Sequence, residues 1–253
     1  GTGLSDPGGG STDAQFQKVA LPSAAGQYEF YTGLTMGPDG KLYTGVLSGA
    51  VLRMNADGSG REAVVNTGGR PLGFDFTADG QLVVADAIKG LLALQPDGSL
   101  RVLADTVGGD PIRYADAVVI ATDGLMYFTD ATRRFSPAEL GTFDAALLDV
   151  LEHSCTGRVL VYAPGTGRTS VMMEGLCFPN GVALSGDERH LFVAETGEYR
   201  IWKVESSARE LDAKTLAAGG DARGRVGILM DCSITLTIRA LKTPGAWMCP
   251  RSC

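Results

Sequence analysis

The sequence predicts an all-β protein, and more specifically a β-propeller built of four-stranded antiparallel blades. Short runs rich in Val, Leu and Phe alternate along the chain with Asp-Gly turns, which is the pattern of β-hairpins. The turn glycines Gly40, Gly80 and Gly124 follow one another at intervals of 40 and 44 residues. Four-stranded units that repeat about every 40–50 residues, one unit for each blade, are typical of propellers. In this fold each small sheet stacks on the next around a central channel.

Two complete units come first in the predicted propeller. Each holds four strands, and hairpins in both turn at an Asp-Gly pair. The expected strands cover residues 31–36, 41–45, 50–54 and 62–65 in the first unit, and 72–76, 81–85, 90–94 and 100–103 in the second.

The third unit is interrupted, and the fourth is the last that can be recognised. The expected strands cover residues 117–120, 125–129, 157–162 and 169–173 in the third unit, and 181–185, 190–195 and 199–204 in the fourth. Residues 29–204 are therefore expected to form the propeller, with about four to five blades in the whole chain.

Residues 131–156 interrupt the third unit and carry a helix signal. Ser136 is a candidate N-cap, Pro137 suits the first helical position, and Glu139 follows three residues after the cap. The run 147–151 continues an apolar face. The insertion is expected to be helical, either as a cap over one end of the propeller or as a peripheral decoration.

The composition fits one large all-β domain and argues against some partners. The 253 residues include 35 glycines, as a turn-rich β architecture requires. A net charge of −7 argues against nucleic acid, since phosphate binding needs a basic face. No apolar run is long enough to span a bilayer and no segment resembles a signal peptide, so no membrane partner is expected and a cytoplasmic location is favoured. Residues 1–28 are expected to form a flexible leader.

The five cysteines show no arrangement that predicts a disulfide framework or a zinc site. Their spacing contains no Cys-x-x-Cys, and three of them crowd near the end of the sequence. Reduced, non-catalytic thiols are therefore predicted at all five positions, which are Cys155, Cys177, Cys232, Cys249 and Cys253.

Residues 205–253 depart from the repeat and are predicted to be an atypical tail. The Asp-Gly turns stop after the fourth unit, and no further unit is completed. Residues 228–239 are compatible with one partial strand.

Polar residues recur at one end of the predicted hairpins. The second strand of a unit ends at Asp86, Asp130 or Glu195, while Gly45 takes this place in the first unit. The first strands begin near Thr32, Leu72, Ala115 with Asp116, and Asn180. In an up-and-down sheet these two places lie at the same end, so the side chains are expected around one channel mouth. Such oxygen atoms suit a hard cation.

Six strings of this sequence resemble the strictosidine synthase-like family. They are GRPLGFDF at 69–76, VADAIKGLL at 84–92, YFTD at 127–130, LDVLEH at 148–153, TGRVL at 156–160 and FPNGVALS at 178–185. The resemblance is dense from about residue 30 to residue 204. It implies membership of a group of six-bladed propellers that includes gluconolactonases and paraoxonase-type esterases.

The resemblance also implies a calcium site, and this sequence supplies only part of it. Calcium-dependent relatives place Glu, Asn, Asn and an Asp-Asn pair at the starts of first strands. Asn180 matches one of these, Ala115 replaces another with Asp116 beside it, and Thr32 stands where Glu is expected. The Asp-Asn pair has no counterpart in this sequence. A shifted reading frame over residues 231–239 would permit a sequence that resembles the family at this place. A frameshifted end is therefore one hypothesis for the tail. Calcium binding stays open, and no other cofactor is expected.

The function implied is the hydrolysis of small-molecule esters or lactones. Asp130 or Asp86 is predicted to activate water, with Glu195 at the same channel mouth and His153 as a further candidate base, and Asn180 and Asp116 are the candidate metal ligands. The condensation reaction of the family's namesake is disfavoured, because its catalytic Glu lies in a late blade. The sequence contains no Gly-x-Ser-x-Gly motif.

Plain structural roles compete with each of these assignments. Asp at a strand end often hydrogen-bonds its own backbone, Asn180 precedes a glycine and suits a tight turn, and a lone His such as His153 or His190 is more often structural. The alternative function is a non-catalytic propeller remnant that binds ligands or partners. Open blade edges would favour a homo-oligomer in which a second copy covers the gap.

Overall fold

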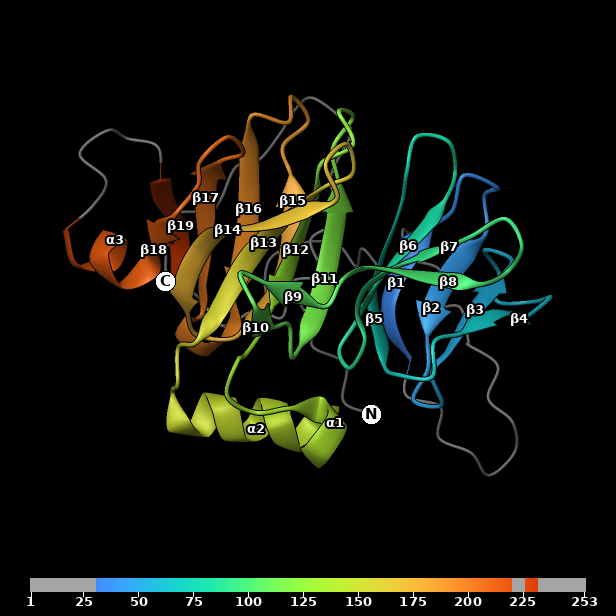
Figure 1. Cartoon of the computed structure of the whole chain (residues 1–253), viewed down its shortest axis with the longest axis horizontal. Helices are drawn as coiled ribbons and strands as arrows, with labels where there is room; N and C mark the ends of the chain where they lie inside the picture. Colours follow the sequence, from blue (N-terminus) through green and yellow to red (C-terminus); the bar gives the residue numbers. More distant parts are fainter. Residues whose placement is uncertain (1–30, 220–225, 232–253) are drawn as a thin grey trace, which may run out of the picture.

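The computed structural model describes residues 31–219 and 226–231, and its main feature is a series of four four-stranded antiparallel blades. The first blade consists of β1 (Thr32–Met36), β2 (Leu42–Gly45), β3 (Ala50–Met54) and β4 (Glu62–Asn66). The second consists of β5 (Pro71–Phe76), β6 (Leu82–Asp86), β7 (Gly90–Leu94) and β8 (Leu100–Ala104). The predicted propeller fold is confirmed (Figure 1).

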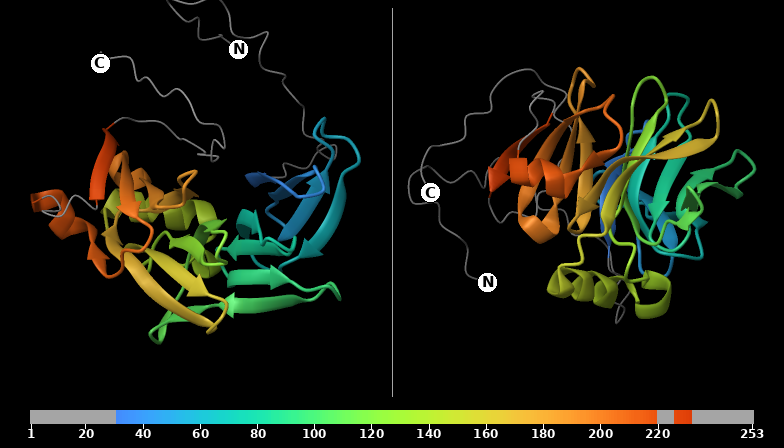
Figure 2. Two further views of the ribbon diagram at one scale, coloured as in Figure 1. Left: turned by 90° about the horizontal axis from the view of Figure 1, so that it is seen from above. Right: turned by 60° about the vertical axis from the view of Figure 1, so that its left-hand side comes forward.

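The third and fourth blades follow a two-stranded hairpin, β9 (Thr106–Val107) and β10 (Asp110–Pro111). The third blade consists of β11 (Ala115–Ile120), β12 (Met126–Asp130), β13 (Gly157–Ala163) and β14 (Arg168–Leu176). The fourth consists of β15 (Pro179–Leu184), β16 (His190–Glu195), β17 (Arg200–Glu205) and β19 (Val226–Asp231). Seen from above, the four sheets follow one another around an arc (Figure 2).

The part of the tail that the structure describes belongs to the propeller rather than standing apart from it. β19 pairs with β17 and supplies the fourth strand of the last blade. A short strand, β18 (Leu211–Asp212), adds a fifth, parallel strand to the third blade by pairing with β14, and α3 (Ala213–Gly219) follows it. The leader and the predicted strand beyond residue 231, with the proposed frameshift, lie outside the described residues.

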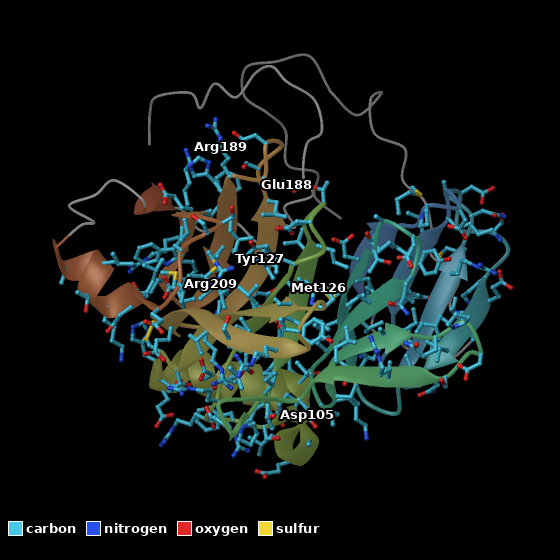
Figure 3. The ribbon with its side chains drawn as sticks, turned by 45° about the horizontal axis from the view of Figure 1, so that its top comes forward. Asp105, Met126, Tyr127, Glu188, Arg189 and Arg209 are labelled. Atoms are coloured by element: carbon cyan, nitrogen blue, oxygen red, sulfur yellow. A yellow bond between two sulfur atoms is a disulfide. The ribbon has the colours of Figure 1, made fainter. Side chains whose placement is uncertain are left out.

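Neighbouring blades share an apolar core because their middle strands are buried on both faces. Between the third and fourth blades this core includes the fully buried Trp202, Leu191 and Val159. The turns of the two blades are also joined: Glu188, at the tip of the β15–β16 turn, accepts hydrogen bonds from the backbone N–H and the hydroxyl of Thr122. Figure 3 shows Glu188 at this turn.

The segment after β17 is held against the third blade through Tyr127. The Tyr127 hydroxyl donates a hydrogen bond of 3.1 Å to the carbonyl of Ser206, and the guanidinium of Arg209 lies 6.0 Å from the centre of the Tyr127 ring. Figure 3 shows Tyr127 and Arg209 side by side. These contacts explain why the chain continues along the blades beyond the last recognisable repeat.

The first strands of successive blades approach closely at the centre of the arc, and Gly73 on β5 marks one such approach. A Cβ atom at Gly73 would lie 2.4 Å from the carbonyl oxygen of Asp116 on β11. Gly181 occupies the same register position in the fourth blade, since Gly73 lies opposite Ala85 and Gly181 opposite Ala194. A Cβ atom at Gly181 would meet its nearest neighbour, the Cβ of Ala194, at 3.4 Å.

We expect Gly73→Ala to lower the free energy of unfolding by about 1–3 kcal/mol, because backbone atoms of β11 must move to accept the methyl group. Gly181→Ala is the matched control and should change stability by much less. Urea denaturation of both variants measures the difference. Equal effects at the two positions would contradict close packing of β5 against β11.

The insertion forms two helices, α1 (Pro137–Leu140) and α2 (Thr142–Glu152), at one end of the blades (Figure 1). Ala145 of α2 is buried in a cluster with Leu72, Tyr114 and Phe178, which lie where three blades begin. The Tyr114 hydroxyl also donates a hydrogen bond of 3.0 Å to the carbonyl of Thr142. The insertion is therefore a cap over this end, which decides between the two predicted roles.

Ser136 is the N-cap of α1 and Pro137 its first residue, as predicted, although the Ser136 side chain makes no capping hydrogen bond. The apolar run 147–151 lies on α2, where Leu147, Leu148, Val150 and Leu151 are exposed, and α2 buries Ala145 and Asp149. Neither these helices nor α3 is long and apolar enough to cross a membrane, and the described residues contain no other helix of that kind.

The prediction of reduced thiols is wrong for two cysteines. Cys155 and Cys177 form a disulfide, with their Cα atoms 3.8 Å apart. Sequence spacing did not reveal the pair because pairing of Gly157 with Leu176, the residues just inside the two cysteines, is what brings these segments together. Cys232, Cys249 and Cys253 lie outside the described residues.

Candidate functional site

Three buried carboxylates occupy equivalent places in three blades. Asp86, Asp130 and Glu195 end the second strands, and each is at most 2% exposed. They will be called the junction carboxylates, because each accepts a hydrogen bond from the backbone N–H of the segment that leads into its own blade. The donors are Arg70 for Asp86 at 3.0 Å, Tyr114 for Asp130 at 2.8 Å and Cys177 for Glu195 at 2.7 Å.

The remaining contacts of these carboxylates are also structural. Asp130 pairs with the buried Arg158 at 2.9 Å, and Glu195 accepts a hydrogen bond of 2.7 Å from the indole N–H of Trp202. Burial raises the pKa of both Asp130 and Glu195, against the lowering effect of these donors. Asp86 accepts two further backbone N–H groups. The contacts support a structural role for all three, while the water-activating role of Asp130 or Asp86 and the catalytic role of Glu195 stay predictions.

The channel side of the site is built by a β-bulge that recurs in every blade. The first strand of each blade shifts its register near its start, so that one extra residue stands opposite the partner strand. Between the pairs Ala115–Asp130 and Val118–Phe128, two residues of β11 stand against Thr129, and because Ala117 donates its N–H to the Thr129 hydroxyl we assign Asp116 as the extra residue. The four bulge residues are Gly33, Leu72, Asp116 and Asn180. Bulges of this kind re-aim side chains next to functional sites.

The register corrects the alignment that the sequence suggested. Thr32 and Ala115 were compared with Asn180, but both are paired with the second strand as Pro179 is. Gly33 and Asp116 are the true counterparts of Asn180. The structure thus brings Asp116 and Asn180, the two predicted metal ligands, to equivalent places on neighbouring blades.

Thr129 links these two places directly. Its hydroxyl accepts the Ala117 N–H at 3.0 Å and lies 3.3 Å from the Asn180 carbonyl oxygen, to which it donates. The bulges of β11 and β15 are therefore held in a fixed relation by one buried side chain. Asn180 itself is exposed and Asp116 is half-buried.

Asp116 lies in an electrostatic setting that suits acid–base chemistry. It keeps partial contact with solvent but is enclosed by protein on most sides. This burial raises the pKa of Asp116 to about 7, although the nearby Arg70 guanidinium acts in the opposite direction. Burial likewise raises the pKa of Tyr114, so its phenol remains protonated at neutral pH.

Arg70 and Tyr114 are site residues that sequence reasoning missed. Each immediately precedes the first strand of its blade, as Phe178 does in the fourth, and their carbonyl groups accept equivalent hydrogen bonds from Ala87, Ala131 and Thr196. Arg70 interacts electrostatically with Asp116 and Asp86. An alignment of the blades that began one residue earlier would have identified Arg70, Tyr114 and Phe178 as equivalent positions.

The described residues do not make up a calcium site at the channel. Calcium takes about six to eight oxygen ligands. Of the four bulge positions, Asp116 and Asn180 carry oxygen atoms, whereas Gly33 and Leu72 offer no side-chain ligand. Calcium binding by the whole protein is untested.

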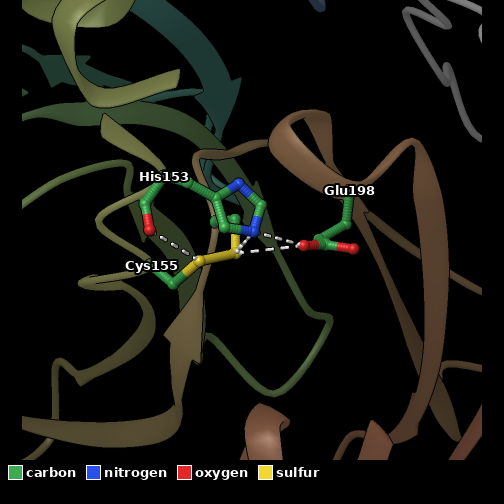
Figure 4. A group of neighbouring side chains, drawn as sticks. His153, Cys155 and Glu198 are labelled. Carbon is green, nitrogen blue, oxygen red and sulfur yellow. Dashed lines mark hydrogen bonds and ion pairs between the residues drawn. A yellow bond between two sulfur atoms is a disulfide. The ribbon is translucent and has the colours of Figure 1, made fainter. Parts of the chain in front are cut away.

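His153 is linked indirectly to the junction carboxylate Glu195, because Arg200 contacts both Glu195, at 3.4 Å, and Glu198. His153 ends α2 in the left-handed backbone region with φ 55°, and its Nε2 is 2.7 Å from Glu198 Oε1. Its other close neighbour is Cys177, with 3.9 Å between Nε2 and Sγ (Figure 4). The role of His153 as a base stays a prediction, and its direct contacts are with Glu198 and Cys177 rather than with a junction carboxylate.

Known proteins share this pattern in sequence. The model of the strictosidine synthase family matches residues 116–208, and that of the N-terminal region of strictosidine synthase-like proteins matches residues 33–54. Protein STRICTOSIDINE SYNTHASE-LIKE 7 of Arabidopsis thaliana is 37% identical over 184 residues, which cover 71% of this chain and 48% of that protein. This chain belongs to the strictosidine synthase-like family.

Similar proteins with other names also occur among the relatives of this strictosidine synthase-like chain. An adipocyte plasma membrane-associated protein of Danio rerio is 36% identical over 147 residues, covering 56% of this chain and 34% of that protein. The chain thus spans about half the length, or less, of these curated relatives.

Solved structures similar to the strictosidine synthase-like chain are propellers with different roles. A gluconolactonase from Xanthomonas campestris matches with a TM-score of 0.59 and 21% identity, covering 73% of this chain and 62% of that one. A chain of a nidogen/laminin complex matches with a TM-score of 0.57 and 17% identity, covering 79% and 65%. At these identities the likeness shows the fold alone.

Proposed function

We propose that this chain hydrolyses small-molecule esters or lactones at the channel mouth, with Asp116 as the base. The observation that carries the proposal is the placement of Asp116 on the bulge of β11, half-buried and near the Arg70 guanidinium, with a pKa raised to about 7. A general base is most effective when its pKa lies near the working pH. A gluconolactonase has the same fold, and this likeness supports the hydrolysis of lactones as the reaction class.

The chemistry can be written with the residues that surround Asp116. The Asp116 carboxylate takes a proton from water as the water oxygen attacks the carbonyl carbon. The Arg70 guanidinium stabilises the negative charge that develops on the carbonyl oxygen. The protonated Asp116 then returns its proton to the alkoxide that leaves.

The cap covers an apolar cluster at the end of the blades where Asp116 lies. Tyr114 and Phe178 pack edge to face with ring centres 5.4 Å apart, and both belong to the cluster under α2 with Leu72. Apolar walls with a few convergent polar groups are typical of small-molecule sites. Lactones or esters with an apolar substituent are therefore the expected substrates.

The test is a panel of lactones and aryl esters assayed with Asp116→Asn and with Asp123→Asn as the matched control. Asp123 lies in the exposed turn at the other end of the same hairpin. We expect kcat/KM to fall by about 10²–10⁴-fold in Asp116→Asn and to stay unchanged in the control. Wild-type kcat/KM should rise with pH around 7 and should not change with a chelator. Equal activity of both variants would contradict the assignment.

A non-catalytic binding module is the second candidate, and one observation favours it. Phe143, Leu147 and Leu151 follow one another at a spacing of four on α2 and are 76%, 46% and 72% exposed. Such an apolar stripe is typical of an interaction surface. No turnover on the panel, together with concentration-dependent association in light scattering, would favour this function and the predicted homo-oligomer.

A further inference from the structure

Four side chains with metal-binding atoms converge beside the cap, away from the proposed catalytic residues. They are His153 at the end of α2, Cys155 two residues later, Cys177 between β14 and β15, and Glu198 in the 3-10 helix η2 (Thr196–Glu198). Their ligand atoms all lie within 4.8 Å of one another (Figure 4). This set will be called the Cys–His–Glu cluster.

Backbone contacts hold the cluster together. Gly157 pairs with Leu176, which places Cys155 against Cys177. The Gly197 N–H donates a hydrogen bond of 2.9 Å to the Cys177 carbonyl, and this holds η2 and Glu198 beside the sulfur atoms. Arg200 engages Glu198 through Oε2, so Oε1 remains directed at His153 and Cys177. The donor atoms are therefore positioned by the fold.

We propose that reduction of the Cys155–Cys177 disulfide converts this cluster into a tetrahedral zinc site. Two thiolates, one imidazole and one carboxylate are a donor set that suits Zn²⁺. With bond lengths of about 2.3 Å for sulfur and 2.0–2.1 Å for nitrogen or oxygen, a sulfur atom lies about 3.5 Å from either across a tetrahedral zinc. In the structure Cys177 Sγ is 3.9 Å from His153 Nε2 and 3.7 Å from Glu198 Oε1.

The conversion needs a dithiol or phosphine reductant and balances in two steps. A dithiol gives two electrons and two protons to the disulfide, which becomes two thiols, while the dithiol closes to its own disulfide. Zn²⁺ then displaces to solvent both thiol protons and the proton that His153 Nε2 shares with Glu198, and binds the nitrogen lone pair that is freed. The ion pair between His153 and Glu198 opens to admit the metal.

The exposure of the four side chains allows this exchange. Both cysteines are buried, whereas the side chain of His153 is 54% exposed and that of Glu198 is 28% exposed. The metal therefore has access from the side of His153. A cytoplasmic location is predicted for this protein. In a reducing compartment of that kind the thiol form of the two cysteines would prevail. Either linkage fastens the cap to the third and fourth blades.

Cobalt(II) is a suitable probe because tetrahedral thiolate coordination gives it a sulfur charge-transfer band. The experiment uses the full chain with Cys232, Cys249 and Cys253 replaced by Ser, reduced with a phosphine or left oxidised. We expect one equivalent of Co²⁺ to bind to the reduced protein with this band, none to the oxidised protein, and Zn²⁺ to displace the cobalt. A reduced, folded protein that shows no such band would overturn the proposal.

The two ligands that are not buried, His153 and Glu198, allow a test with less risk to the fold. Glu198→Gln and His153→Gln should each weaken Co²⁺ affinity by at least about 10–100-fold, since even second-shell changes cost this much. His190→Gln is the matched control, because His190 lies at the start of β16 outside the cluster, and its affinity should be unchanged. Affinity that is indifferent to both Glu198→Gln and His153→Gln would also refute the site.

Discussion

Replacing Arg158 by Met is expected to lower the free energy of unfolding by about 3–5 kcal/mol. Arg158 is 2% exposed and its partner Asp130 is fully buried, with 2.9 Å between Nε and Oδ2. The same guanidinium donates hydrogen bonds to Asp110 and to the Pro111 carbonyl, both at 2.9 Å. Removing it leaves the Asp130 carboxylate buried without its counter-charge, which is more costly than the loss of a well-solvated pair.

Urea denaturation measures this loss, and Arg133→Met is the matched control. Arg133 pairs with the same Asp110, at 3.3 Å, but its side chain is 39% exposed. An exposed pair contributes about 0–1 kcal/mol, so the control should be close to wild type. The double variant Asp130→Asn with Arg158→Met should lose less than Arg158→Met alone, because no buried charge remains. If Arg133→Met and Arg158→Met had equal effects, the fastening role of the pair would be wrong.

Asp116→Asn is expected to stabilise the protein above pH 7 while it removes activity. The pKa of Asp116 is raised from 3.8 to about 7 in the folded chain. Between about pH 4 and pH 7 the folded protein therefore binds more protons at this group than the unfolded chain, so stability falls as pH rises. Above pH 7 the cost of the buried charge is fully present, and it amounts to at most about 4 kcal/mol, less by the amount that water screens this half-buried group.

The neutral Asn does not carry this cost. The variant should therefore exceed wild type in unfolding free energy at pH 8 and differ little from it at pH 4, as measured by urea denaturation at both values. A purely structural Asp116 would instead give a variant that is less stable at pH 8. Gain of stability with loss of turnover is the pattern expected when a functional group is held in an unfavourable setting.

Local chemistry made the strands and turns of the blades predictable. The Asp-Gly pairs at Gly40 and Gly80 set hairpins in both of the first two blades, and strands such as β3 (Ala50–Met54) and β7 (Gly90–Leu94) have the predicted bounds. By contrast, β18 has only two residues and pairs with β14, which is distant in the sequence. A strand this short has no alternating pattern from which it could be predicted.

The candidate site was predictable only in part. The sequence placed the strand-end carboxylates at the ends of the blades. Whether a carboxylate is solvated or held in a buried ion pair depends on partners such as Arg158, which lies on the next strand. Likewise, the helix signal of residues 131–156 was visible, but which residues of α2 are buried depended on the blade ends beneath it.

The sequence by itself determined the repeating hairpins, the family and therefore the propeller, because turn chemistry and strand periodicity act over a few residues. Only the tertiary structure decided that Asp116 rather than Ala115 is the counterpart of Asn180, since one bulged residue shifts the register of the strand. It also decided that Cys155, Cys177, His153 and Glu198 meet, because strand pairing and the turn after β16 bring together residues that are separated in the chain.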